Sequence, residues 1–231
     1  EKRRAFGWLD DDAPKATRQT TGRPTGAGIL ALFPLQAIRK GITSMNQSHL
    51  VLLGDSIFDN AVYVPGGPAV IDHMNHMLPR GWKSTLLARD GDMVADMTGQ
   101  FSKTPPDATH LVISIGGNDA LETTGVLGMP VTSMGDALRR LTEIRRSFQR
   151  RYRAMLQKAL ALELPLAVCT IYDSVPGLSG ELQTALCLFN DTITQEAMAA
   201  RTSVIDLRRF CTESADYSAV SPIEPSAQGG H

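Results

Sequence analysis

A serine directly follows a strongly apolar segment in the run LVLLGDS, residues 50–56. We interpret the apolar part as a buried strand, so that Ser56 opens the loop after it. A hydroxyl in this position is well placed to attack an acyl carbon, but it is a weak nucleophile until a neighbouring base accepts its proton. The run therefore indicates acyl transfer through a serine, and it requires a base from elsewhere in the chain.

Two later segments offer hydrogen-bond donors for the oxyanion that such a reaction forms. Gly91 carries a backbone N–H that no side chain obstructs, and Asn118 presents a side-chain NH₂ after two glycines. The backbone N–H of Ser56 would be a third donor. Each donor of this kind lowers the reaction barrier by about 3–4 kcal/mol in well-studied hydrolases.

The elements that must position these residues are short apolar runs that alternate with helical patterns. The expected strands cover residues 49–53, 83–88, 110–115, 166–171 and 203–207, and the expected helices cover 69–78, 92–101, 133–164 and 180–200. This alternation predicts a parallel sheet covered on both faces. Five strands favour a flavodoxin-like α/β fold, a three-layer α/β/α sandwich whose site lies at the carboxyl ends of the strands. The carboxyl ends of the first three expected strands are followed by Ser56, by Gly91 and by the run GGND, residues 116–119. We expect all three in loops.

The longest predicted helix begins after Ser133, a plausible N-cap, and stops before Pro165. Its apolar residues repeat every 3.6 positions and are expected to face the core; they are Leu141, Ile144, Phe148, Tyr152, Met155 and Ala159. Seven arginines lie outside this stripe, at positions 139, 140, 145, 146, 150, 151 and 153. We interpret them as a solvated face, since the overall net charge gives no support to the alternative, contact with an anionic surface.

The composition limits which partners the protein can bind and how its domains are organised. A net charge of −1 gives no indication of a nucleic-acid partner, and no apolar run is long enough to span a membrane. Three cysteines without CxxC spacing argue against a disulfide framework and a zinc site, which favours a cytoplasmic location. Residues 1–46 are predicted to be a partly flexible arm or linker, and residues 47–231 the single folded domain.

The runs GDS (54–56) and GGND (116–119), with Gly91 between them, resemble the first three sequence blocks of the SGNH/GDSL hydrolase family. The resemblance covers residues 49–231. It implies a flavodoxin-like sandwich, hydrolysis of a small-molecule ester without a cofactor, and an oxyanion hole built from Ser56, Gly91 and Asn118.

The sequence differs from the family pattern in the last of the family's sequence blocks. The family carries Asp-x-x-His followed by Pro, with the histidine as general base; here Ser221 stands at the aspartate position and Glu224 at the histidine position. Ser226, Gly229 and Gly230 resemble the start of the family's final helix, so that helix is expected to be truncated at His231.

Glu224 is the first candidate to activate Ser56, either as an unorthodox base or by orienting a water molecule, because burial can raise the pKa of a carboxylate. Its alternative role is to cap a turn. His231 could fold back toward the serine. The other four histidines are expected at the far edge of the sheet (His49, His110) or as a surface pair (His73, His76).

Two functions follow from these residues. The first is an esterase that forms an acyl-enzyme on Ser56. The alternative is a catalytically degenerate family member that keeps the pocket for a small acyl or carbohydrate ligand, because the usual histidine is missing. Residues 61–68 and 120–130 are expected to line the pocket, and their small and apolar side chains suit short acyl chains.

Overall fold

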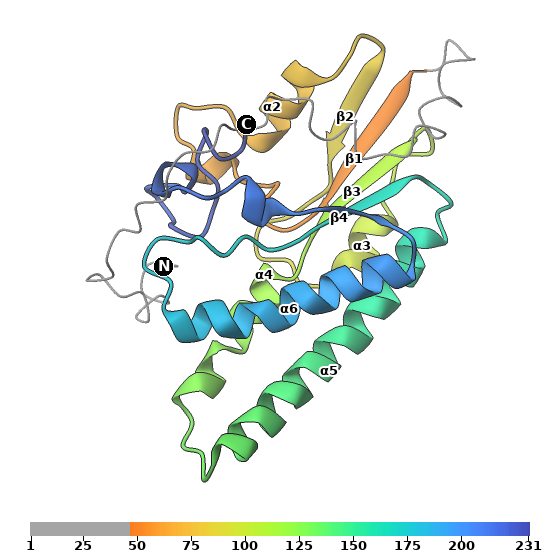
Figure 1. Ribbon diagram of the computed structural model, residues 1–231. Coiled ribbons are helices and arrows are strands. Elements are labelled where there is room, and N and C mark those ends of the chain that lie inside the picture. Colours follow the sequence, from red (N-terminus) through yellow and green to blue (C-terminus); the bar gives the residue numbers. More distant parts are fainter. Residues whose placement is uncertain (1–46) are drawn as a thin grey trace.

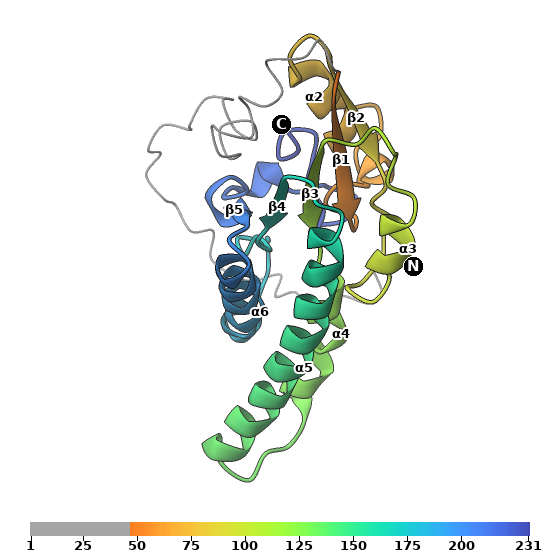
Figure 2. The same ribbon diagram turned by 90° about the vertical axis from the view of Figure 1, so that its right-hand side faces the viewer.

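Five parallel strands form one sheet in the computed structural model, which describes residues 47–231. The strands are β1 (Ser48–Gly54), β2 (Trp82–Leu86), β3 (His110–Ser114), β4 (Leu166–Cys169) and β5 (Ser203–Ile205). Their order across the sheet is β2-β1-β3-β4-β5 (Figures 1 and 2). This is the flavodoxin-like order, so the predicted fold class is confirmed.

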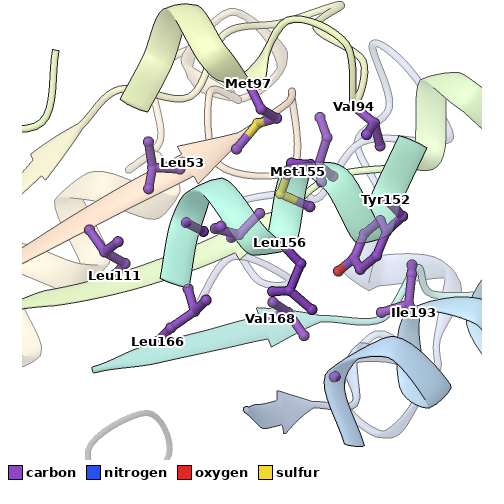
Figure 3. Close-up of a cluster of buried hydrophobic side chains, with 14 of the residues drawn as sticks. Leu53, Val94, Met97, Leu111, Tyr152, Met155, Leu156, Leu166, Val168 and Ile193 are labelled. Carbon is purple, nitrogen blue, oxygen red and sulfur yellow. The ribbon is translucent and has the colours of Figure 1, made fainter. Parts of the chain in front are cut away.

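Helices cover both faces of the sheet. On one face α3 (Met97–Phe101), α5 (Met134–Leu160) and α6 (Gly180–Ala199) pack against apolar side chains of β1, β3 and β4. Figure 3 shows side chains from these helices and strands meeting in that core. On the other face α2 (Val70–Met77) packs on the alternate side chains of the same strands. Because successive residues of a strand point to opposite faces, the continuously apolar strands supply both cores.

The sheet edge at the carboxyl ends of the strands carries the connecting segments that matter for function. They include α4 (Gly117–Glu122), the 3₁₀ helices η3 (Ala61–Tyr63) and η4 (Thr124–Gly128), and the C-terminal segment with η5 (Leu207–Arg209) and η6 (Ser214–Asp216). Since all strands are parallel, every one of their carboxyl ends lies at this edge.

Helix α5 begins and ends close to its predicted limits. The Ser133 hydroxyl accepts the Asp136 N–H at 3.1 Å, which confirms the predicted N-cap. The last four residues of the predicted stripe, from Phe148 to Ala159, are buried in the core. Leu141 and Ile144 are only half-buried and line a pocket, although Ile144 also packs against the edge of the core.

The predicted helix over residues 92–101 is wrong in its first half, because only Met97–Phe101 is helical. Two carboxylates bind backbone N–H groups in this segment: the Asp96 carboxylate accepts from Met93, and the Asp119 carboxylate accepts from Val94. Such side-chain bonds hold residues 92–96 in turns.

The run GGND also differs from its predicted loop. Gly116 has a φ of +124° and precedes α4, and the Ala120 N–H donates to the Gly116 carbonyl. Asn118 and Asp119 therefore lie in the first turn of a short helix, where the helix dipole favours a carboxylate.

Two findings concern the ends of the chain and the membrane. The predicted arm, residues 1–46, lies outside the described residues. Within residues 47–231, no helix is long and apolar enough to cross a membrane.

Candidate active site

Ser56 is held at the end of β1 by an unusually close backbone approach. Gly54 has a φ of +132°, and a Cβ atom there would lie 1.8 Å from the carbonyl oxygen of Ser114. The Gln100 side chain accepts the Gly54 N–H at 2.8 Å and donates to the Gly54 carbonyl at 2.7 Å. The Asp55 N–H donates to the Ser114 carbonyl. The turn that presents Ser56 is therefore fixed on both sides by β3 and α3.

The Ser56 side chain lies at the floor of a pocket and is only 5% exposed. Among the described residues, the backbone N–H groups of Ser56 and Gly91 donate to no backbone carbonyl. Both groups are consequently available to hydrogen-bond a ligand.

Asn118 lines the same pocket from the first turn of α4. Its side-chain NH₂ donates to the carbonyl of Asp92 at 2.9 Å, which leaves one N–H for another acceptor. The neighbouring Asp119 is buried; it accepts the Val94 N–H at 3.0 Å and lies 3.3 Å from the guanidinium of Arg151. These bonds tie the loop after β2 to α4.

Gly91 lies in that loop, with a φ of +87°. The loop is anchored by the Asp90 N–H, which donates to Asp59 at 2.9 Å, and by the bond between Asp92 and Asn118. Gly91 itself is exposed and does not line the pocket, although its neighbour in sequence contacts Asn118.

Glu224 reaches the pocket from the C-terminal segment and is 1% exposed. Its backbone forms a tight turn, in which its N–H donates to the Ser221 carbonyl at 3.1 Å and its carbonyl accepts from Ser218 at 2.8 Å. The predicted turn is thus a feature of this residue, and Glu224 lines the same pocket as Ser56.

Two buried side chains fix the residues on either side of Glu224. The Asn60 amide donates to the Pro225 carbonyl at 3.1 Å, while its oxygen accepts the N–H of Val70 at the start of α2. The Tyr172 hydroxyl donates to the Ile223 carbonyl. The sequence analysis assigned no role to Asn60 or Tyr172. Only the position of Asn60, six residues after the end of the strand that precedes Ser56, offered a signal.

Asp55, the residue before the serine, is also buried. Burial raises its pKa from 3.8 to about 8, and repulsion from Glu224 and Asp119 adds to the increase, while a hydrogen bond from the Ile57 N–H opposes it. Asp55 is therefore protonated at neutral pH. It also lines the pocket, to which Glu224 contributes a second carboxyl group.

The pocket has a cavity volume of about 100 Å³. Beyond Ser56, Asn118 and the two carboxyl groups, its walls are mostly apolar and come from α4, η4, α5, α6 and the segment after β4. The expected lining by residues 120–130 holds as far as Leu127, whereas residues 61–68 line a separate shallow depression with Ser218 and Ala227.

All five histidines fall among the described residues, and none of them lines this pocket. His49 and His110 lie at the amino ends of β1 and β3, as predicted. His73 contacts the Ala227 carbonyl, and its ring lies 5.1 Å from that of His231. His73 and His231 therefore pair with each other and not with Ser56. Within residues 47–231, no three His, Cys, Asp or Glu side chains are grouped so as to hold a metal ion.

Comparison with known structures gives the same fold. An extracellular lipase from Streptomyces rimosus aligns with a TM-score of 0.57 and 17% identity, over 79% of this chain and 94% of the lipase. A phospholipase A1 from Streptomyces albidoflavus NA297 aligns with a TM-score of 0.59 and 16% identity, over 80% and 95%. An acetyl xylan esterase variant from Geobacillus stearothermophilus aligns with a TM-score of 0.57 and 15% identity, over 81% and 92%.

A comparison with curated proteins gave no match. A family model, in contrast, matches residues 52–230, which includes the end of the strand before Ser56, the GGND run and the turn at Glu224. The chain therefore belongs to the GDSL-like lipase/acylhydrolase family.

Proposed function

We propose that this protein is an ester hydrolase that acts through an acyl-enzyme on Ser56. The observation that carries the proposal is the convergence of Ser56, Asn118 and Glu224 on one pocket with otherwise mostly apolar walls. A nucleophile, an amide donor and a carboxylate are the groups that acyl transfer requires.

In the proposed reaction, Ser56 Oγ attacks the acyl carbon of the ester while its proton passes to the Glu224 carboxylate. The N–H group of Ser56 and the Asn118 amide stabilise the oxyanion that forms on the carbonyl oxygen. When the intermediate collapses, the ester C–O bond breaks and Glu224 returns the proton to the leaving alcohol. Water then attacks the acyl-enzyme by the same route, and Ser56 is released with the free acid.

Asp55 supports the assignment of Glu224 as the base. Two buried carboxyl groups that repel each other do not both ionise readily, so a proton held by one favours the charged form of the other. With its pKa near 8, Asp55 holds that proton at neutral pH. A neutral Asp55 therefore adds no negative charge that would oppose ionisation of Glu224.

The apolar walls of the pocket favour binding of the acyl chain of the ester. Helices α5 and α6 line the pocket with the apolar side chains of Leu141, Leu182 and Phe189. Each methylene group buried there stabilises binding by about 0.8 kcal/mol. The proposed substrates are therefore esters of apolar carboxylic acids.

The test is a rapid-mixing measurement with p-nitrophenyl butyrate. The protein is expected to release a burst of nitrophenol equal to one per active site, followed by slower turnover. Ser56→Ala is expected to abolish both phases, and Ser102→Ala, a change of an exposed serine, to leave them intact. Equal rates for the protein and Ser56→Ala would disprove the proposal.

Glu224→Gln tests the base separately. This variant keeps the size of the side chain but removes its proton affinity, so kcat is expected to fall by roughly 10²–10⁴ with little change in KM. Unchanged kcat in a correctly folded variant would exclude Glu224 as the base.

The second candidate function is ligand binding without catalysis. It is favoured by the absence of histidine from the pocket and by the buried Ser221 hydroxyl, which has no hydrogen-bond partner among the described residues. The double change Ser221→Asp with Glu224→His rebuilds the family's usual pair. A large gain from no measurable activity would support this second function, and a loss from measurable activity would support Glu224 as the native base.

A further inference from the structure

An exposed apolar projection lies beside the mouth of the pocket. No charged residue occurs between Glu122 and Asp136. Five large apolar side chains are exposed here, and we call them the apolar tip: Leu127 (41%), Met129 (54%), Val131 (47%), Met134 (75%) and Leu138 (56%). Eleven large apolar side chains are exposed in the described part of the chain. Five of these eleven therefore fall within twelve consecutive residues, which is a concentrated patch.

The tip projects because α5 is much longer than the strands that it covers. A helix of 27 residues spans about 40 Å, whereas the seven residues of β1 span about 23 Å. The C-terminal half of α5 packs on the sheet, and its N-terminal half extends beyond it with the segment that contains η4 (Figures 1 and 2).

The tip is continuous with the wall of the pocket. Val126 and Leu127 line the pocket from η4, and Leu141 lines it from α5. The segment between them carries Met129, Val131 and Met134 on the outside. Whatever the tip contacts is thereby brought next to the apolar wall that leads to Ser56.

Basic side chains border the tip. Arg139, Arg140, Arg145 and Arg146 lie in the half of α5 that adjoins it, against only two acidic residues, Asp136 and Glu143. Arg139 and Arg140 both lie near Asp136, at 3.7 and 3.4 Å. An apolar patch with a positively charged border matches the layering of an anionic lipid surface, in which headgroup charges overlie acyl chains.

We propose that the apolar tip inserts into anionic lipid surfaces and so places the mouth of the pocket against the lipid. The size of the tip favours lipid over a protein partner, because stable protein interfaces use roughly 20–30 residues on each side. The inference goes beyond ester hydrolysis, since adsorption requires no reaction at Ser56.

The experiment is a sedimentation assay with vesicles of phosphatidylcholine, with and without phosphatidylglycerol. The full chain carrying Ser56→Ala is used so that the lipid stays intact. It is expected to sediment with the anionic vesicles more than with the neutral ones, and added salt is expected to reduce the binding.

Two sets of variants locate the contact. Met129→Asp with Met134→Asp is expected to reduce binding to anionic vesicles by about tenfold or more, because two large side chains lose their apolar contact. Met198→Asp is the matched control, and this change is expected to leave binding unchanged. Met198 is 71% exposed and lies near the C-terminal end of α6. Arg139→Gln with Arg146→Gln is expected to weaken binding to anionic vesicles only. Thermal unfolding confirms that each variant is folded.

Three results would overturn the proposal. They are an absence of vesicle binding, equal loss in the tip variant and the Met198 control, and a dimer in light scattering that the tip substitutions dissociate. The last result would assign the tip to a second copy of the chain. Because none of these measurements depends on hydrolysis, a failure of the ester-hydrolase proposal leaves them interpretable.

Discussion

The residue directly before Ser56, Asp55, affects the charge in the pocket. Its carboxyl group is 2% exposed, and it interacts electrostatically with Glu224 and Asp119. Removing a carboxylate from water disfavours its charged form, and two nearby carboxylates increase that effect. The protonated state of Asp55 is therefore a property of the folded protein that the unfolded chain does not share.

This difference predicts a pH-dependent stability. The pKa of Asp55 is about 8 in the folded protein against 3.8 for the free side chain, so the folded state binds an extra proton between these values. The contribution to stability is complete below about pH 4 and is lost as the pH rises toward 8. In the unaltered protein, the unfolding free energy is expected to fall by up to about 1.4 kcal/mol per pH unit in this range. Asp55→Asn is expected to abolish this pH dependence.

Urea denaturation at a series of pH values measures the slope. Asp107→Asn is the control, because hydrogen bonds from Lys83 and His49 lower the pKa of the exposed Asp107 and the change does not affect the buried carboxyl group. If Asp55→Asn keeps the slope of the unaltered protein, Asp55 is ionised in the folded state and does not favour the charge on Glu224.

The sequence predicted the polar residues of the site better than the residues that hold them. Ser56, Asn118 and Glu224 follow recognisable runs, and all three line the pocket. Gln100 and Tyr172 had no such signal, because each binds a backbone group about fifty residues away. Contacts of this kind depend on the packing of complete elements and leave no periodic pattern in the sequence.

At the scale of elements, the strand–turn unit that presents Ser56 depends on Gly54. Strands β1, β3 and β4 were predictable, since each is a short apolar run whose side chains are buried on both faces of the sheet. The starts of α3 and α4 were not, because Asp96, Asp119 and a left-handed Gly116 decide where the helical hydrogen bonds begin. Local bonding by single side chains thus limits prediction at this scale.

Gly54→Ala is expected to destabilise the protein by about 3 kcal/mol or more and to abolish ester hydrolysis. The added Cβ would overlap the Ser114 carbonyl, and an alanine at a φ of +132° is strained. Thermal unfolding and the nitrophenol burst measure the two effects. Gly99→Ala is the control, since a Cβ there meets nothing within 4 Å and the position lies in α3, where alanine is favoured. Equal stability of the two variants would show that β1 can move away from β3.

At the scale of the whole molecule, the strand order brings distant parts of the chain to one pocket. The loops after β1 and β3 leave the sheet at its switch point, where the direction of winding reverses. The C-terminal segment contributes Glu224 to the same place, and α5 and α6 extend the pocket away from the sheet. The sequence predicted the carboxyl-end location but not this extension, which arises from the length of α5 relative to the strands.

The extension predicts how the protein distinguishes acyl chains. Leu141 lines the outer part of the pocket and is absent from the sheet-packed core, so a larger side chain there shortens the pocket without disturbing the sheet. Leu141→Trp is expected to lower kcat/KM for p-nitrophenyl octanoate by about tenfold and to leave the acetate ester nearly unchanged, because only the longer chain reaches this wall. Leu160→Trp, at the exposed C-terminal end of the same helix, is the control and is expected to affect neither ester. If Leu141→Trp lowers both activities equally, the acyl chain does not occupy the space between α5 and α6.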